Sequence, residues 1–161
     1  MIRPLERVPA REMWAAIWAA QAAALDQRTT VEAVADRLDT PAGKVDRALL
    51  ALRLAAMAAR GLLDLTPDRR WVVTARGKDA AAATATRQLG DVEVWQVVAA
   101  CHTGARIDTA AVATRLGVAA MRVDLWCRAQ EATGGRCQPV DGRWQVTPAG
   151  RAALAALDLS A

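Results

Sequence analysis

The chain contains the stretch Arg70-Trp71-Val72-Val73-Thr74-Ala75-Arg76-Gly77-Lys78 and, 73 positions later, the related stretch Arg143-Trp144-Gln145-Val146-Thr147-Pro148-Ala149-Gly150-Arg151. A second match has another offset, because Ala33-Val34-Ala35-Asp36-Arg37-Leu38 returns 78 positions later as Ala111-Val112-Ala113-Thr114-Arg115-Leu116. A repeat of this length is too long for a solenoid unit and long enough to hold its own small core. We therefore expect two domains, residues 1–89 and residues 90–161.

The change of offset from 78 to 73 gives the first copy five extra residues. Lys44-Val45-Asp46 matches Arg122-Val123-Asp124 at the offset of 78, so the extra residues are expected between Val45 and Trp71. Residues 45–61 lack proline and internal glycine and are rich in Ala, Leu, Met and Arg, which favour helix. The pattern predicts a third helix that is lengthened by more than one turn.

Periodicity and capping signals predict the first two helices. The spacing predicts a helix over residues 10–25, and we expect one face of it to pack in the core. The residues on this face are Trp14, Ile17, Trp18, Gln21, Ala22 and Leu25. Thr29 lies three residues before Glu32, which is the spacing of a capping box. The helix that it begins is expected to run through Val34 to Leu38.

A third helix is expected directly after a short turn. Thr40 and Pro41 have the order of an N-cap and a first helical residue, and Gly61 is a typical C-terminal stop. Its core face is expected to carry Val45, Leu49, Leu52 and Ala56. Two short helices joined in this way form a helix-turn-helix.

Strands and closing helices complete each copy. In the first copy we expect strands over residues 62–65 and 71–74 and a helix over about 75–89. In the second copy Asp108 caps a helix, Asp141-Gly142 is a strong turn pair, and Pro148 opens the closing helix. The elements expected there are helices over about 91–103, 108–116, 119–133 and 148–157, and strands over 136–140 and 143–147.

Composition favours a mostly helical protein. The sequence has no Phe and no Tyr, and its apolar residues are mainly Ala, Val and Leu. It has no run of 18 apolar residues without a charge, and residues 1–11 lack the apolar core of a signal peptide. We therefore predict a cytoplasmic protein.

The metal-ligating residue types predict no cofactor. Cys101, His102, Cys127 and Cys137 fit no closed zinc spacing. At the offset of 78, Cys101 aligns with Ala23 and Cys127 with Leu49, so we interpret both as small apolar core residues. His102 is the single histidine, and no catalytic motif surrounds it. We predict that the protein is not an enzyme.

Net charge is +4 and unevenly distributed. Residues 1–89 hold 14 Lys and Arg against 10 Asp and Glu, whereas residues 90–161 hold seven of each sign. Affinity for a polyanion is therefore expected mainly in the first copy.

The chain resembles the winged helix-turn-helix superfamily twice, over about residues 12–158. Trp144-Gln145-Val146-Thr147-Pro148-Ala149-Gly150-Arg151-Ala152-Ala153-Leu154 resembles the second wing strand and following helix of MarR-like and PadR-like bacterial regulators. Val123 to Gly134 resembles their recognition helix, although Gln130 replaces a usual large apolar residue and the first third helix is five residues too long. The implied fold is mostly α with small β-hairpin wings, as tandem winged helix-turn-helix domains.

A helix-turn-helix suggests double-stranded DNA as the partner, with the third helix in the major groove. In the first copy Thr40, Gly43, Lys44 and Arg47 lie opposite the expected core face, where Lys44 and Arg47 are donors for guanine or phosphate. Arg69 and Arg70 at the wing tip are placed for phosphates or a minor groove. Their equivalents in the second copy are Arg122 and Arg143. The predicted function is a bacterial or mobile-element transcriptional regulator.

A second apolar stripe predicts a packing role, while the near-neutral second half and its poorly polar third helix favour an alternative function. Leu50, Leu54 and Met57 recur at helical spacing away from the expected core face, so they predict an interface with the other domain, a second subunit or a protein partner. Tandem winged helices without a strongly basic face occur in kleisin-associated subunits of condensin-like complexes. The alternative is therefore a protein-interaction module with little sequence-specific DNA binding.

Overall fold

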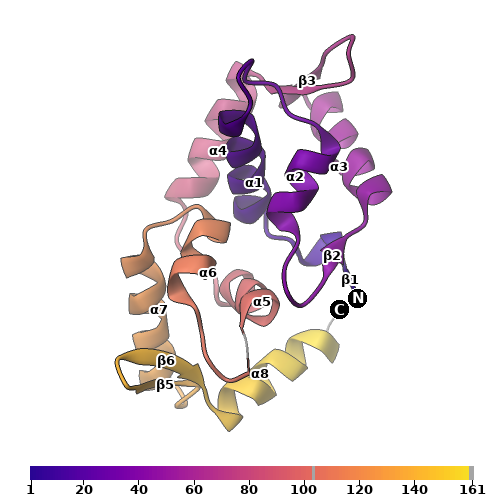
Figure 1. Cartoon of the computed structure of the whole chain (residues 1–161). Coiled ribbons are helices and arrows are strands. Elements are labelled where there is room, and N and C mark those ends of the chain that lie inside the picture. The colour runs from indigo at the N-terminus through magenta and orange to yellow at the C-terminus, as the bar shows by residue number, and fades with distance from the viewer. Residues whose placement is uncertain (103, 160–161) are drawn as a thin grey trace. The chain divides into compact units, whose positions relative to one another are not determined.

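The computed structural model describes residues 1–102 and 104–159, the side chains of residues 158 and 159 excepted. The chain divides into two compact units, Met1–Arg87 and Gln88–Ala161. Across the described residues the protein is mostly helical, with small pairs of strands (Figure 1). None of the described helices is both long enough and apolar enough to cross a membrane.

The elements of the first unit follow the predicted order, with two additions at its start, a strand and a 3-10 turn, and a third, also a strand, between the second and third helices. Its elements are β1 (Ile2–Arg3), a 3-10 turn η1 (Leu5–Arg7), α1 (Ala10–Ala23), α2 (Val31–Leu38), β2 (Lys44–Val45), α3 (Arg47–Ala59), β3 (Leu63–Leu65), β4 (Trp71–Val73) and α4 (Ala75–Thr86). Strand β1 pairs with β2 in parallel, and β3 pairs with β4 as an antiparallel hairpin. Helices α2 and α4 both pack against α1, and α3 packs against α2.

The second unit has the same order without the β1–β2 pair. Its elements are α5 (Asp91–Cys101), α6 (Thr109–Leu116), α7 (Ala120–Ala132), β5 (Cys137–Val140), β6 (Arg143–Val146) and α8 (Pro148–Leu159). Strands β5 and β6 form an antiparallel hairpin around Asp141 and Gly142, which both have positive φ as the predicted turn requires. The predicted helix over 91–103 ends at Cys101, and residue 103 lies outside the described residues.

Each hairpin also pairs with the segment before the second helix. The backbone N–H and C=O of Thr29 exchange hydrogen bonds with Trp71, with N···O distances of 2.7 and 3.0 Å. In the second unit the Ile107 N–H donates to the Trp144 carbonyl at 3.0 Å, and the Val146 N–H donates to the Ala105 carbonyl at 2.7 Å. Both units therefore place a third short extended segment along the second strand of the hairpin.

The repeated Thr and Gly of the opening stretch have the same structural role in both units. The hydroxyl of Thr74 caps α4 by accepting from the Gly77 N–H, and Thr147 caps α8 through Gly150 in the same way. A Cβ on Gly77 would lie 2.0 Å from the Leu62 carbonyl oxygen, and one on Gly150 would lie 2.2 Å from that of Arg136. Glycine is required because the closing helix begins against the chain that enters the hairpin.

Two capping predictions have different outcomes. The side chain of Asp108 accepts from the Ala111 N–H at 3.1 Å, so the predicted cap of α6 is confirmed. The predicted cap of α2 is wrong by one residue, because Thr30 accepts from the Ala33 N–H at 3.2 Å. The Thr29 backbone is bound to the hairpin instead, so its neighbour takes the N-cap position.

The predicted stripe of the first helix is only half buried. Trp14, Ile17 and Gln21 are buried, as expected for the face of α1 that packs against α2. The remaining members of the predicted stripe are exposed or half exposed, namely Trp18, Ala22 and Leu25. The predicted helix is two residues too long at its end, because α1 ends at Ala23 and Leu25 lies in the following turn.

The five extra residues lie in a turn, and the prediction of a lengthened third helix is wrong. Helices α3 and α7 each have 13 residues. The connection before α3 spans residues 39–46, whereas the connection before α7 spans residues 117–119, which accounts for the difference of five. The offset of 73 therefore holds from the start of the third helix onward, and Cys127 corresponds to Leu54 instead of Leu49.

The longer turn is held by the residues at the start of the chain. Strand β2 within this turn pairs with β1, and the Lys44 N–H donates to the Met1 carbonyl at 3.0 Å. The Arg3 guanidinium binds both carboxylate oxygens of Glu12 at 2.6 and 2.7 Å and also donates to the Leu38 carbonyl at 3.1 Å. Arg3 and Glu12 are both buried, so this ion pair fixes β1 to α1 and α2.

Candidate functional site

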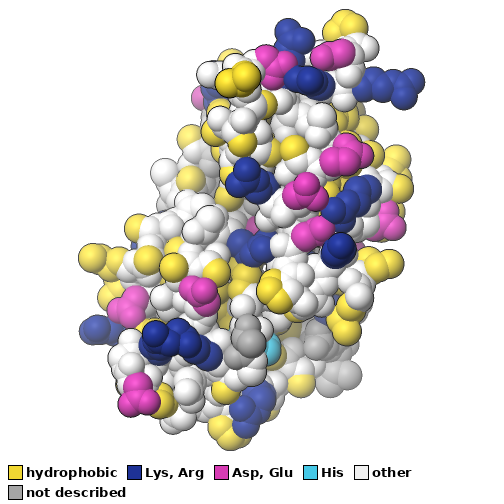
Figure 2. Space-filling view, viewed as in Figure 1, with side chains coloured by type: hydrophobic (Ala, Val, Ile, Leu, Met, Phe, Trp, Pro, Cys, Tyr) yellow, Lys and Arg dark blue, Asp and Glu magenta, His cyan; other side chains and the backbone are white. Residues whose placement is uncertain are grey.

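The predicted and the observed surfaces differ most at the outward face of α3, where residues predicted to lie in the core are exposed. Asp46 caps this helix by accepting from the Leu49 N–H at 3.0 Å, so the predicted start at Thr40 and Pro41 is wrong. Its exposed residues are all apolar, and they are Ala48, Leu49, Leu52, Ala55, Ala56 and Ala59. Leu49 is 51% exposed and Leu52 is 67% exposed. Figure 2 shows hydrophobic side chains along the edge of the first unit where α3 lies.

The predicted interface residues of this helix lie in the core. Leu50 and Leu54 are fully buried and Met57 is 9% exposed, and all three belong to the apolar cluster of the first unit. The two predicted stripes of the helix therefore exchange roles. The cause is the start of the helix at Arg47, which separates Val45 on β2 from the periodicity of α3. Leu50, Leu54 and Met57 are thus unavailable to an external partner.

Arg47, a predicted base-reading residue, is engaged within its own unit. Its guanidinium donates to Asp39 at 2.7 and 3.1 Å, to Asp36 at 3.2 Å and to the Val45 carbonyl at 2.8 Å. Burial alone would raise the pKa of Asp39, but hydrogen bonds from Arg47 and the Val45 N–H outweigh it and lower that pKa. The hydrogen bond to Asp39 likewise raises the pKa of Arg47. This charge therefore stabilises the turn before α3.

The other three predicted residues near the turn do not lie on the helix. Thr40 and Gly43 close a tight turn, in which the Thr40 hydroxyl and the Gly43 backbone are bound to each other at 3.1 Å. Gly43 is buried, and a Cβ there would lie 3.1 Å from the Met1 carbonyl oxygen. Lys44 is exposed on β2. The surface predicted for DNA in the first unit is thus covered in part by β1.

The two arginines of the β3–β4 turn differ in their contacts. Arg70 forms an ion pair with Asp26 at 2.5 Å and lies 3.5 Å from Asp68. Arg69 is exposed at the tip, in the left-handed region with φ of 60°. The visible face of the first unit mixes basic and acidic side chains (Figure 2). Arg69 is therefore the predicted wing residue whose charge is most accessible.

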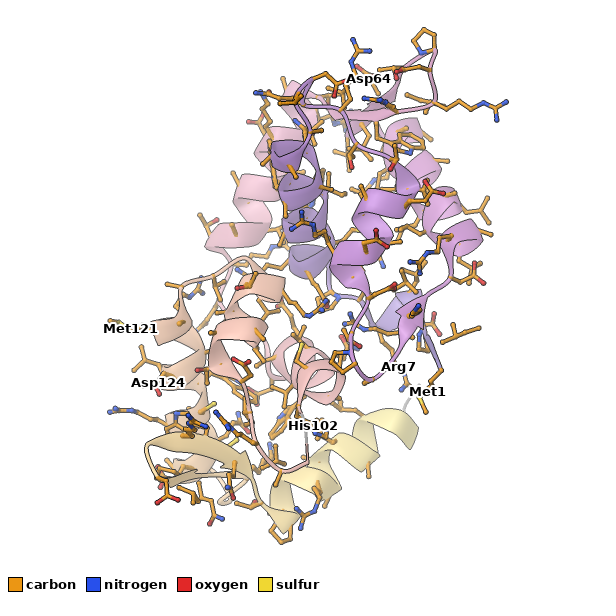
Figure 3. The ribbon with its side chains drawn as sticks, in the orientation of Figure 1. Met1, Arg7, Asp64, His102, Met121 and Asp124 are labelled. Atoms are coloured by element: carbon orange, nitrogen blue, oxygen red, sulfur yellow. The ribbon has the colours of Figure 1, made fainter. Side chains whose placement is uncertain are left out.

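Helix α7 presents a different outward face. Met121 is 73% exposed and points away from the second unit (Figure 3), and Leu125 is 57% exposed. The side chain of Arg128 is 68% exposed and lies 3.4 Å from Asp124. At the offset of 73, Met121, Leu125 and Arg128 correspond to Ala48, Leu52 and Ala55 of α3. Among the described residues, the outward face of α7 therefore carries an exposed arginine, whereas the outward face of α3 carries none.

Sequence reasoning missed Arg128 and the exposed Leu49 and Leu52. Of the predicted residues in the second unit, Arg122 is half-buried in the first turn of α7 and Arg143 is exposed at the start of β6. The sequence does contain a signal for these positions. If the offset of 73 is applied to the third helix as well as to the hairpin, Leu52 aligns with Leu125.

Gln130 is a buried residue of a partly buried polar network in the second unit. It is 4% exposed, and its amide donates to Asp91 at 3.1 Å. The Trp126 indole N–H donates to the same oxygen at 3.0 Å, while Arg136 donates to Gln130 at 3.5 Å. Asp91 at the first turn of α5 therefore supplies the acceptor that satisfies the buried Gln130 amide.

The three cysteines and the histidine lie in the second unit. Cys127 and Cys137 are buried next to each other, and a hydrogen bond between the thiols and burial raise the pKa of Cys127. Cys101 is half-buried against the same core, and the His102 ring nitrogen lies 2.7 Å from the Gly104 carbonyl. Among the described residues, no group of three His, Cys, Asp or Glu side chains is placed to hold a metal ion.

Comparison of the chain with family models, with curated proteins and with solved structures finds no match.

Proposed function

We propose that the protein is a protein-interaction module made of two tandem winged helix-turn-helix domains, with the outward face of α3 as its docking surface. The winged-helix assignment is supported by the order of three helices, a hairpin and a closing helix in both units. It is also supported by the backbone pairing of Thr29 with Trp71, which adds the third short strand of a wing.

The observation that carries the proposal is the composition of the outward face of α3. In a helix-turn-helix the third helix reads base edges with side chains that donate or accept hydrogen bonds. The exposed residues of α3 are alanines and leucines, which provide neither. Each leucine that docks against protein contributes on the order of 1–2 kcal/mol from the apolar area removed from water. This surface therefore favours a protein partner over a major groove.

The positions of the cations support the same conclusion. Arg47 is bound to Asp39 and Asp36, and Arg53 donates to the carbonyls of Leu5 at 2.6 Å and Val8 at 3.2 Å. Arg53 is half-buried, and this burial lowers the pKa of its guanidinium. Both arginines of α3 therefore make hydrogen bonds to groups of their own unit.

Duplex DNA remains the second candidate partner, and the second unit has the features that favour it. Arg128 is exposed on the outward face of α7, and Arg143 is exposed on the hairpin that follows. Both side chains suit phosphate contacts. Bacterial transcription regulation is the function that such contacts would serve.

Two binding measurements test the proposed function. Fluorescence anisotropy with random duplex DNA across a salt series should detect weak binding that is unchanged by Lys44→Ala. If α7 contacts phosphates, the slope of the logarithm of the binding constant against the logarithm of the salt concentration should decrease in magnitude by about 1 in the Arg128→Ala variant. Tight, sequence-discriminating binding that Lys44→Ala or Arg47→Ala abolishes would contradict the proposal.

The protein partner is tested by display of fragments from the source genome. Fragments should bind the wild-type chain and Leu125→Glu, but should fail to bind a Leu49→Glu/Leu52→Glu variant. Leu125→Glu is the matched control, because Leu125 is an equally exposed leucine at the equivalent position of α7. Circular dichroism of both variants should match the wild type, since all three leucines are exposed.

A further inference from the structure

We propose that the outward face of α3 pairs with α3 of a second copy of this chain, antiparallel and about a twofold axis. This inference rests on the proposed protein-interaction function and names the partner. A twofold interface is isologous, so one surface must be complementary to itself. The spacing, the side-chain sizes and the end charges of α3 all satisfy that condition.

The spacing of the exposed residues is that of a helix–helix seam. Leu49, Leu52, Ala56 and Ala59 alternate at intervals of three and four residues, the pattern of the core positions of a coiled coil. Ala48 and Ala55 border the seam and are also exposed. Small residues let two helices approach closely, toward the lower end of the usual interaxial distance of about 8–10 Å.

An antiparallel arrangement matches large side chains to small ones. With the axis between residues 53 and 54, Leu52 lies opposite Ala55 of the second copy, and Ala48 lies opposite Ala59. Leu49 then packs near Ala56 and Ala59 of the second copy. A parallel pair would instead stack leucine on leucine at one end and alanine on alanine at the other, which leaves voids at the alanine end.

The ends of the helix are complementary in charge. Three carboxylates, Asp36, Asp39 and Asp46, lie near the start of α3 around Arg47, which binds Asp36 and Asp39. Arg60 follows the last residue of α3 and is exposed. Antiparallel pairing brings each Arg60 toward the start of α3 in the other copy, where these three carboxylates outnumber Arg47, whereas parallel pairing would bring the two Arg60 side chains together.

The size of the surface sets the expected affinity. Helix α3 has 13 residues, about 20 Å in length, so the paired area is at the small end for specific interfaces. We expect a weak, reversible dimer that dissociates on dilution. In α7 the equivalent of Ala55 is Arg128, and its long charged side chain would prevent the same close seam.

Sedimentation equilibrium of the full chain over a wide concentration range tests the pairing. The wild type should show a monomer–dimer equilibrium, and Leu52→Glu should weaken it by at least about tenfold, because a charge enters the buried centre. Leu125→Glu, the matched control, should leave the equilibrium unchanged. A wild type that stays monomeric at all concentrations, or a dimer that Leu125→Glu disrupts and Leu52→Glu does not, would overturn the proposal.

Cysteine cross-linking tests the direction of the helices. An equal mixture of Ala48→Cys and Ala59→Cys chains should form a disulfide-linked heterodimer under mild oxidation by copper phenanthroline, faster than either variant alone. Faster linking of each variant to itself would overturn the antiparallel arrangement. The proposed function can be tested apart from the dimer. If a genome-encoded fragment binds only when Leu49 and Leu52 are present and no dimer forms, the protein-interaction function stands and the self-pairing fails. If α3 binds in the major groove of DNA, both proposals fail.

Discussion

Helices α3 and α7 have equal lengths and bury equivalent positions, yet their outward faces differ. Leu50 and Leu54 in α3 correspond to Val123 and Cys127 in α7, and all four are fully buried. On the outward side α3 exposes alanines and leucines, whereas α7 exposes Met121 and Leu125 with Arg128 between them and the helix end. The comparison shows that equivalent buried positions are apolar in both helices, while the exposed positions differ in character.

The turns before these two helices also differ between the units, in length and in the side chains that hold them. In the first unit β2, which lies within residues 39–46, pairs with β1, and Arg53 donates to the carbonyls of Leu5 and Val8. In the second unit residues 117–119 make a short turn, and Trp126 stands where the first unit has Arg53. The first unit thus uses charged groups to attach a strand, while the second uses an aromatic side chain that contacts Trp95 edge to face.

The largest expected effect concerns the ion pair that belongs to the first unit alone. Glu12→Leu should destabilise that unit by about 3–5 kcal/mol, because it leaves the Arg3 guanidinium buried without its carboxylate. Hydrogen exchange at increasing denaturant should show the loss in α1 and α2 and no change in α5 to α7. The double variant Arg3→Met/Glu12→Leu should recover most of the stability, and no recovery would argue against an uncompensated charge.

The two leucines at positions 52 and 54 should respond very differently. Leu54→Ala should cost about 3 kcal/mol of unfolding free energy, because it opens a cavity in the first core. Leu52→Ala should cost less than about 0.5 kcal/mol in the monomer, since its side chain is exposed. Urea denaturation of dilute protein measures both. Equal losses would mean that the buried and exposed faces of α3 are assigned incorrectly.

The equivalent glycines should give matched losses in separate units. Gly77→Ala and Gly150→Ala should each destabilise by about 2–3 kcal/mol, because the new methyl group meets a carbonyl oxygen. Hydrogen exchange should assign each loss to its own unit. Gly90→Ala is the control, since nothing lies within 4 Å of its Cβ position. A neutral result at either position would show that the closing helix can shift away.

The charged turn before α3 should give the first unit a pH dependence. Asp39 has a pKa below its ordinary value of 3.8, so its stabilising contribution is present above pH 4 and lost as the pH falls through the lowered pKa. Asp39→Asn should therefore cost about 1–2 kcal/mol at pH 7, and the difference from wild type should shrink below about pH 4. Thermal unfolding from pH 7 to pH 2 measures it. A gap that stays constant with pH would contradict the role of this carboxylate.

The smallest effects should be equal in the two units. Thr30→Ala and Asp108→Ala each remove the cap of a second helix of eight residues, so each should cost about 1 kcal/mol. Thermal unfolding of the two single variants measures this. Thr29→Ser is the control for the first unit, because Thr29 binds the hairpin through its backbone. A large difference between the caps would indicate that the two second helices are held by different forces.

The repeat predicted the architecture well because its signals are local. Asp108, Asp141-Gly142 and Pro148 each determine the backbone within a few residues of themselves, and all three act where expected. The mostly helical fold with small antiparallel hairpins follows from such signals.

The candidate site was predicted less well because its geometry depends on distant residues. The pairing of β1 with β2 connects residues more than 40 positions apart, and nothing in the periodicity of residues 45–61 indicates it. Once Val45 belongs to a strand, the helix begins at Arg47, and its buried face moves from Leu49 and Leu52 to Leu50 and Leu54. A start that differs by a few residues therefore exchanged the core with the surface.

The most direct test of the α3 surface is a methyl NMR titration of the leucines in the full chain. With rising protein concentration, the methyl signals of Leu49 and Leu52 should shift, while those of Leu50, Leu54 and Leu125 stay in place. Added duplex DNA should leave Leu49 and Leu52 unchanged. Shifts at Leu49 and Leu52 on addition of DNA, together with no dependence on protein concentration, would contradict a protein-binding role for this face.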